Sequence, residues 1–125
     1  MTDEDLVFRA EKIIVDRLDA LTERQGESGR TQLSNAISVA QATDHPAVFI
    51  NWLRYQRSRE DFWRIDKAGR EIAKDIHEAI ETILKEFKGE EAMRRIVRFL
   101  GFLRRALIAK EGFEIIPASA SEEGA

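Results

Sequence analysis

The amino-acid sequence predicts an all-α protein, a compact bundle of about five helices in a single domain over residues 1–116. Apolar residues recur at a spacing near 3.6 through almost the whole chain, which is the period of an amphipathic helix. Only seven glycines and two prolines interrupt this pattern. A length of 125 residues is typical of one domain and suffices to bury roughly two thirds of the unfolded chain's surface. We therefore expect helices joined by short loops.

The first two helices are expected on either side of a polar segment that contains glycine. The first runs from about Asp3 to Arg24, with acidic side chains in its first turn, where the helix dipole favours them. Residues 25–29, Gln-Gly-Glu-Ser-Gly, are predicted to end it. Thr31 is the expected N-cap of a short second helix, which fades at residues 42–44.

The third and fourth helices are predicted in the middle of the chain. The third runs from about Pro46 to Trp63, because proline suits the first helical position, and we assign Trp52 on its aromatic side to the core. The fourth runs from about residue 65 to residue 88 and is the most regular. Its isoleucines recur every three or four residues, so Ile76 and Ile80 are expected to be buried.

The fifth helix and the tail complete the prediction. Gly89 is expected to end the fourth helix, and the fifth is predicted over residues 90–110 with Gly112 as its stop. The small and acidic residues 117–125 are predicted to form a disordered tail. The fifth helix is apolar over more than half its circumference once Phe99, Phe102 and Ala106 are counted, which predicts apolar surface exposed for a neighbour.

The composition excludes several classes of protein. The chain has no cysteine, which excludes a disulfide framework and a thiol nucleophile, and its two histidines cannot form a metal site unaided. No apolar run approaches the roughly 18 residues of a membrane helix, and the N-terminus is acidic where a signal peptide is basic. We expect a cytoplasmic protein with no membrane span, no metal and no cofactor.

The net charge of −3 is unevenly distributed along the chain. Residues 46–70 and 90–112 each carry a net charge of +3, whereas the other segments are acidic. Arginine outnumbers lysine by 14 to 6. A planar guanidinium matches phosphate oxygens bidentately, whereas an ammonium acts as a point charge. A phosphate-rich partner is therefore a candidate.

The strongest candidate phosphate contacts lie on the fifth helix. At 100° per residue, three arginines form a narrow stripe with Gly101 among them, and these are Arg94, Arg98 and Arg105. A glycine inside a helix costs about 1 kcal/mol relative to alanine, which suggests that a nucleic-acid backbone or another helix approaches closely.

A second, weaker group of candidates lies on the third helix, and it comprises Arg54, Arg57 and Arg64. Asp61 lies between Arg57 and Arg64 on the same face and is expected to neutralise both in part. Arg59 is expected to stack on the neighbouring aromatic rings. The alternative interpretation of every arginine here is a solvated face held by local ion pairs.

The best catalytic candidates are three carboxylates at i, i+4 and i+7 on the fourth helix, namely Glu71, Asp75 and Glu78. Helical bundles hold magnesium or a di-metal pair with stacked carboxylates. These three point about 100° or more away from the isoleucine stripe, so we expect a solvated face instead. His77 is expected to pair with Glu81. We find no constellation for nucleophilic catalysis and predict that the chain is not an enzyme.

Three short segments occur in an order that resembles a known family. Thr31-Gln32-Leu33 opens a helix after the first loop, and residues 53–59 give a Leu-Arg-Tyr stretch with further arginines. Residues 96–103 form a Phe-rich basic helix that ends in a short polar stop at residues 109–112. Over residues 6–112 the chain resembles the small, all-helical subunit of type III CRISPR effector complexes, in particular the Csm-type (type III-A) small subunit.

The sequence departs from this family after the first segment. The family often has a basic residue there, where this chain has Ser34 and Asn35. Arg30, just before Thr31, is the candidate substitute. Near the end of the fifth helix the family more often carries an aromatic residue and a histidine.

The resemblance implies a non-catalytic subunit that is present in several copies in a ribonucleoprotein. Its partners would be the backbones of the guide RNA and target RNA, other subunits of the effector complex and copies of itself. Two alternatives from other classes remain open. One is a helical homodimeric adaptor, and the other is a small all-α metal-dependent nucleotide hydrolase that uses the acidic row on the fourth helix.

Overall fold

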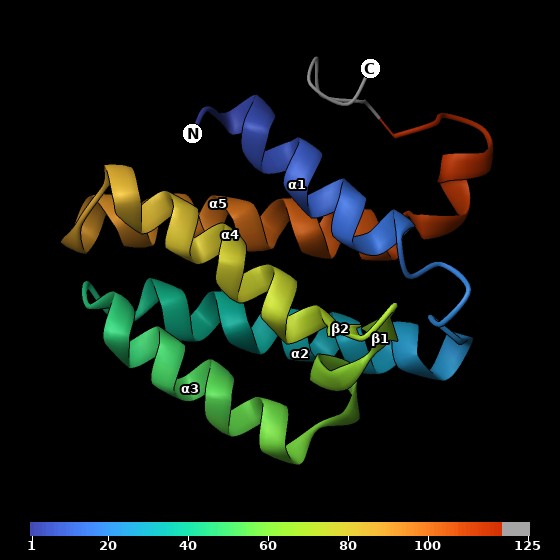
Figure 1. The fold of residues 1–125 in the computed structure, drawn as a ribbon, viewed down its shortest axis with the longest axis horizontal. Coiled ribbons are helices and arrows are strands. Elements are labelled where there is room, and N and C mark those ends of the chain that lie inside the picture. The colour runs from blue at the N-terminus through green and yellow to red at the C-terminus, as the bar shows by residue number, and fades with distance from the viewer. Residues whose placement is uncertain (119–125) are drawn as a thin grey trace.

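The computed structural model describes residues 1–118 and confirms the all-α prediction, with five α-helices in this part of the chain (Figure 1). The elements are α1 (Asp3–Val15), α2 (Glu23–Gln41), α3 (Pro46–Arg59), the 3₁₀ turn η1 (Asp61–Arg64), the strands β1 (Asp66–Lys67) and β2 (Arg70–Glu71), α4 (Ile72–Glu86), α5 (Gly89–Ile108) and the 3₁₀ turn η2 (Lys110–Glu114). Most of the predicted tail, residues 119–125, lies outside the described residues.

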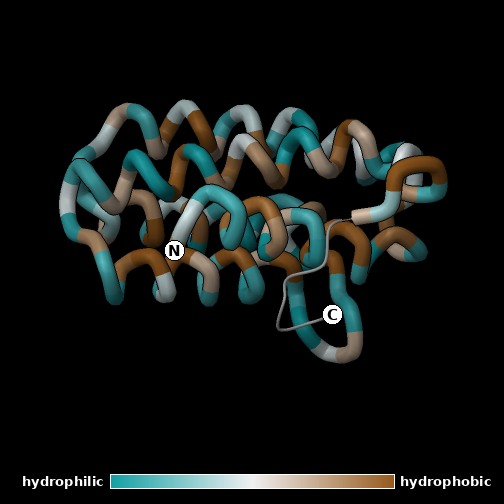
Figure 2. Tube along the Cα trace, turned by 90° about the horizontal axis from the view of Figure 1, so that it is seen from above, coloured by the Kyte–Doolittle hydropathy of each residue, from teal (hydrophilic) through white to brown (hydrophobic). Residues whose placement is uncertain are grey.

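Helix α5 is the central element of the bundle. It packs along α1 and α2 and also contacts α3 and α4, and Figure 1 shows α1 and α4 crossing it. Hydrophobic and hydrophilic residues alternate along the helical segments, as the colouring of Figure 2 shows. Phe99 and Ala106 are buried within the chain, and Phe102 is half-buried against the core. The prediction of an exposed apolar face on α5 is therefore wrong at Phe99 and Ala106, which pack in the core of the chain, whereas Phe102 stays partly exposed.

The boundary between α1 and α2 differs from the prediction. Helix α1 ends at Val15, and α2 begins after Thr22, which forms a capping box with Gln25. The predicted loop at residues 25–29 and the predicted N-cap at Thr31 are wrong, since both lie inside α2. A glycine-rich segment continues as a helix here because the capping box initiates the helix three residues before the first glycine.

The close packing around Gly29 explains why a glycine lies inside α2. A Cβ atom at this position would lie 2.7 Å from Cδ2 of Leu107 and 2.8 Å from Cδ1 of Phe62. Van der Waals contacts between carbon atoms are much longer than these distances. The missing side chain therefore lets α2 approach α5 and η1 closely.

The connection between α3 and α4 is also not the predicted one. Helix α3 ends at Arg59, and an antiparallel hairpin, β1 paired with β2, separates it from α4. Its two-residue turn has Ala68 at φ +52° and Gly69 at φ +82°, the left-handed values that a tight hairpin turn needs. The predicted start of the fourth helix at residue 65 is therefore seven residues too early, because strands of two residues carry no periodic signal.

The core tryptophan is Trp63 and not Trp52. Trp63 is fully buried, and its Nε1 donates a hydrogen bond to Oε1 of Gln32 at 3.0 Å. Trp52 is half-buried, with its ring edge-on to that of Trp63 at 6.0 Å. The two rings are in contact, but only the ring of Trp63, on η1, is fully buried in the core.

The last helix is close to its prediction. Gly89, at φ +54°, is the first residue of α5, which ends at Ile108, two residues before the predicted end. Gly112 lies in η2. Within residues 1–118, no helix has both the length and the hydropathy needed to cross a bilayer.

The burial of Ile76 and Ile80 generates the first test. Both side chains are fully buried, as predicted. We expect Ile76→Ala or Ile80→Ala to lower the free energy of unfolding by about 2 to 5 kcal/mol, because apolar burial is reduced and a cavity remains. Chemical denaturation measures this loss, with Ile108→Ala as the control because Ile108 is 48% exposed. A loss below about 1 kcal/mol at both buried positions contradicts the packing.

The close approach at Gly29 generates the second test. Gly29→Ala should lower the free energy of unfolding by about 1 to 3 kcal/mol, although alanine is the better helix former, because Phe62 and Leu107 must move. Gly101→Ala is the matched control, since nothing lies within 4 Å of a Cβ added there. The control should be stabilised by up to about 1 kcal/mol. Equal effects of the two substitutions on thermal denaturation would refute the role of Gly29.

Candidate nucleic-acid interface

Two of the three predicted arginines of α5 are held by carboxylates. The Arg94 guanidinium donates to Glu90 at 2.9 Å and to Glu91 at 3.1 Å. The Arg98 Nε donates to Oδ1 of Asp3 at 2.9 Å, with a second bond to the other oxygen, and this pairing lowers the pKa of Asp3. A phosphate group that binds Arg94 or Arg98 must therefore displace the carboxylate or share the guanidinium with it.

Arg105, the third predicted arginine of α5, is different. It is exposed and pairs with no carboxylate among the described residues, and its guanidinium lies 5.9 Å from the centre of the Phe102 ring. Gly101 has open space where its side chain would be. This end of α5 therefore keeps a guanidinium available for an external anion.

The predicted arginines of α3 and η1 are also mostly paired. Arg57 binds Glu71 bidentately, with Nε to Oε1 at 2.8 Å and Nη2 to Oε2 at 2.6 Å, and this lowers the pKa of Glu71. Of the two arginines expected to share Asp61, Arg64 binds it, whereas Arg57 does not, because Arg57 is held by Glu71. Arg54 is exposed and has no ion pair with residues 1–118.

The two predicted groups of arginines do not form one site. The hollow beside Arg54 and Arg57 is lined by residues of α3, β2 and α4 and by none of α5. The predicted stacking of Arg59 is confirmed for one ring: its guanidinium lies 5.3 Å from the centre of the Tyr55 ring, and Nη1 donates to the Tyr55 hydroxyl at 3.0 Å.

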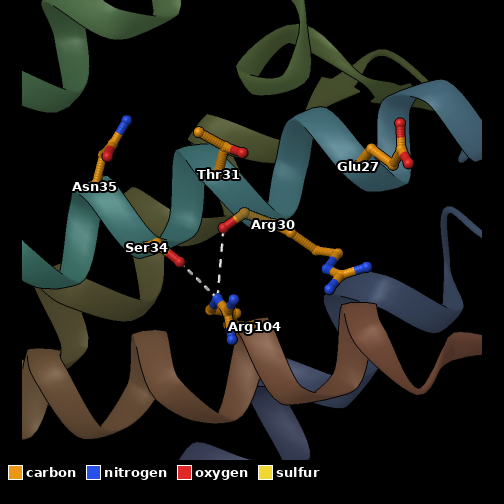
Figure 3. Close-up of a pocket in the computed structure, with 6 residues that line it drawn as sticks. All are labelled: Glu27, Arg30, Thr31, Ser34, Asn35 and Arg104. Atoms are coloured by element: carbon orange, nitrogen blue, oxygen red, sulfur yellow. Dashed lines mark hydrogen bonds between the residues drawn. The ribbon is translucent and has the colours of Figure 1, made fainter.

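A groove between α2 and α5 brings together arginines from two helices. It encloses about 520 Å³ and is lined by Glu27, Arg30, Thr31, Ser34, Asn35 and Arg104 (Figure 3). The Arg104 Nε donates to Oγ of Ser34 at 2.7 Å and to the carbonyl oxygen of Arg30 at 3.4 Å. These bonds hold the Arg104 guanidinium between the two helices.

The donors of this groove are largely unused. The two terminal nitrogens of Arg104 form no hydrogen bond, and Arg30 forms neither a hydrogen bond through its side chain nor an ion pair, within the described part of the chain. Glu27 is the one carboxylate among the described residues of the lining. An arginine anchored through Nε keeps its outer edge for bidentate contact with a phosphate.

The sequence provides only part of the signal for this groove. Arg30 is the residue that the family resemblance offers as a substitute contact, and it lies in the lining. Arg104 was not predicted as a contact. It lies beside the stripe of Arg94, Arg98 and Arg105 on α5, and only the packing of α2 against α5 places it in a groove. Comparison of the chain with protein-family models, with curated proteins and with solved structures gave no match.

The three carboxylates proposed as a metal site are all bound by arginines. Glu71 pairs with Arg57, whereas Asp75 and Glu78 both accept hydrogen bonds from Arg70. Among residues 1–118, no group of three or more histidine, aspartate or glutamate side chains is placed to hold a metal ion. The predicted pair of His77 with Glu81 is confirmed, at 2.9 Å.

Asp75 belongs to a buried network and not to a solvated face. Its partner Arg17 is only 1% exposed. The Arg17 guanidinium also donates to the carbonyl oxygens of Ile13 at 3.1 Å, Ile65 at 3.3 Å and Arg70 at 2.9 Å. Burial raises the pKa of the Asp75 carboxyl, but hydrogen bonds from Arg17 and Arg70 lower it by more. The net result is a pKa below the ordinary 3.8.

This network generates the third test. Asp75→Asn removes the charge opposite a buried guanidinium, so we expect the free energy of unfolding at neutral pH to fall by about 3 kcal/mol. Because the folded-state pKa is lowered, the contribution of the carboxylate is present above 3.8 and is lost as the pH falls through the folded-state pKa. Urea denaturation across this pH range should show that acidification lowers the free energy of unfolding more steeply in the wild type than in the variant.

The control for this test is Asp61→Asn. Asp61 also pairs with an arginine, but its side chain is 89% exposed, so the loss should stay below about 1 kcal/mol. Equal losses for the two variants, or an acid dependence that Asp75→Asn leaves unchanged, would contradict the role of the buried network.

Proposed function

We propose that this chain is a non-catalytic, RNA-binding subunit that contacts the sugar-phosphate backbone through the groove between α2 and α5. The observation that carries the proposal is the pair of guanidinium groups, Arg30 and Arg104, that face this groove without an ion pair among the described residues. Arg105 follows Arg104 on α5 and forms no ion pair with any described residue.

The chemistry of the groove suits phosphates more than bases. Phosphate contacts from arginine and from serine, threonine and asparagine side chains position a nucleic acid without reading its sequence. Ser34, Thr31 and Asn35 supply such polar groups beside the two arginines. A protein that binds in this way accepts RNA of any sequence, as a subunit on an exchangeable guide must.

The assembly that we propose is a type III CRISPR effector complex in the cytoplasm. The family resemblance of the sequence supports this assignment, and the proposed partners are guide RNA, target RNA, other subunits of the complex and copies of this chain. Arg54 is proposed as a further phosphate contact, because it forms no ion pair with residues 1–118. The other predicted arginines would have to release a carboxylate before they bind a phosphate, and these are Arg57, Arg64, Arg94 and Arg98.

A protein-binding adaptor is the second candidate function, and one observation favours it. Val48 and Tyr55 lie seven residues apart on α3 and are 51% and 54% exposed, with the half-buried Trp52 between them. Large exposed apolar side chains on one helix face are typical of contact surfaces between proteins. This surface on α3 is compatible with the contacts between subunits that the proposal requires.

The groove generates the fourth test. Arg30→Glu combined with Arg104→Glu should weaken binding of unrelated single-stranded RNAs to a similar extent, because phosphate contacts do not depend on sequence. The slope of log affinity against log salt should fall by about 0.7 for each phosphate that the variant no longer neutralises. Fluorescence anisotropy measures both quantities, in the isolated chain and in the assembled particle.

The matched control is Lys85→Glu combined with Lys88→Glu, which changes the net charge equally at exposed positions outside the groove. Arg98→Gln should have a smaller effect than Arg105→Gln, because Asp3 already holds Arg98. If the groove variant is folded and assembled and yet keeps wild-type affinity and salt slope, the groove does not bind RNA.

A further inference from the structure

A second basic hollow lies at the junction of α1, the β1–β2 hairpin and α4. We infer that it binds a phosphate monoester, the dianionic group found at the end of a 5′-phosphorylated RNA or in free inorganic phosphate. The hollow shares no element with the groove between α2 and α5. It rests on different observations and stands whether or not the groove binds RNA.

The hollow has the size of a small-ligand site. It encloses about 480 Å³ and is lined by Arg9, Lys12, Ile13, Asp16, Arg17, Lys67, Ala68, Arg70, Asp75 and Glu78. Pockets for small molecules fall in the range of roughly 300 to 1,000 Å³. Ile13 is an apolar part of the lining, and the buried Arg17–Asp75 pair also faces the hollow.

Every carboxylate in this lining is already paired. Asp16 accepts a hydrogen bond from Lys12 at 3.0 Å. Asp75 binds Arg17 and Arg70, and Glu78 binds Arg70. Among the described residues that line the hollow, no carboxylate is therefore left to balance a further cation.

Two cations of the lining remain without a partner. Arg9 and Lys67 form no hydrogen bond through their side chains and no ion pair with any described residue. Five cationic and three anionic side chains line the hollow, which leaves a net charge of +2. The surplus charge belongs to Arg9 on α1 and Lys67 on the hairpin, and both line the same hollow, where an anion would meet them.

A phosphate monoester fits this surplus better than an internal phosphodiester does. It carries a charge of about −1.5 to −2 at neutral pH and offers three strong acceptor oxygens. A guanidinium and an ammonium together supply up to eight N–H donors for these oxygens. An internal phosphodiester carries a single charge, so it would leave one cation of the hollow unbalanced.

The hairpin holds Lys67 in place for this role. Ala68 has a left-handed backbone at φ +52°, which is unfavourable for a residue with a side chain, and Gly69 N–H donates to Oδ2 of Asp66 at 3.0 Å. Arg17 fixes the base of the hairpin through the carbonyl oxygen of Arg70. The hairpin that carries Lys67 is thus tied through Arg17 to Ile13 of α1, the helix that carries Arg9.

The test compares two forms of one short, 3′-labelled oligoribonucleotide, with a 5′-phosphate or a 5′-hydroxyl, bound to the full chain. We expect the wild type to bind the phosphorylated form about tenfold more tightly, because the 5′-phosphate adds a few charge-assisted hydrogen bonds. Arg9→Gln combined with Lys67→Gln should abolish this preference. Lys85→Gln combined with Lys88→Gln removes the same charge elsewhere and should preserve it.

Inorganic phosphate identifies the source of the ligand. If it competes with the phosphorylated oligonucleotide, the hollow takes free phosphate; if only phosphorylated RNA competes, the hollow takes RNA ends. The inference is overturned if the wild type does not distinguish the two RNA ends, or if the folded Arg9/Lys67 variant keeps the preference. Failure of the groove proposal appears separately, as unchanged binding of 5′-hydroxyl RNA by the Arg30/Arg104 variant.

Discussion

The buried guanidinium of Arg17 is the interaction on which the arrangement of α1, the hairpin and α4 depends. A charge in the interior is costly unless hydrogen bonds and a counter-charge compensate it. Arg17 meets this requirement with Asp75 and with the carbonyl oxygens of Ile13, Ile65 and Arg70. Since these partners come from three different parts of the chain, one side chain fixes their relative positions.

Ion pairing also divides the many arginines of this chain into two groups. Carboxylates hold the first group, as with Arg57 and Glu71 or Arg70 and Glu78. In contrast, Arg30 and Arg104 have no carboxylate partner in the part of the chain that the structure describes. The capacity of a surface for phosphate depends on such unpaired donors and not on the number of arginines, because a paired guanidinium must first release its carboxylate.

The close packing of α2 on α5 creates the groove that we propose for RNA. Gly29 removes the side chain that would keep the helices apart, and Leu107 fills the contact from α5. The same approach brings Ser34 within hydrogen-bonding distance of Arg104. A glycine that resembles a loop signal in the sequence is therefore a packing residue, and the position of Arg104 beside α2 depends on it.

The sequence by itself determined the all-α class, the burial of Ile76 and Ile80 and short-range pairs such as His77 with Glu81, because these follow from a period of three or four residues within one helix. It did not determine the hairpin at residues 66–71, the burial of Trp63 in place of Trp52, or the pairing of Arg98 with Asp3. Only the tertiary structure decided those, along with the groove formed by Arg30 and Arg104. Each joins or orients segments that are far apart in the sequence, and their contacts depend on how whole helices pack, which local periodicity does not encode.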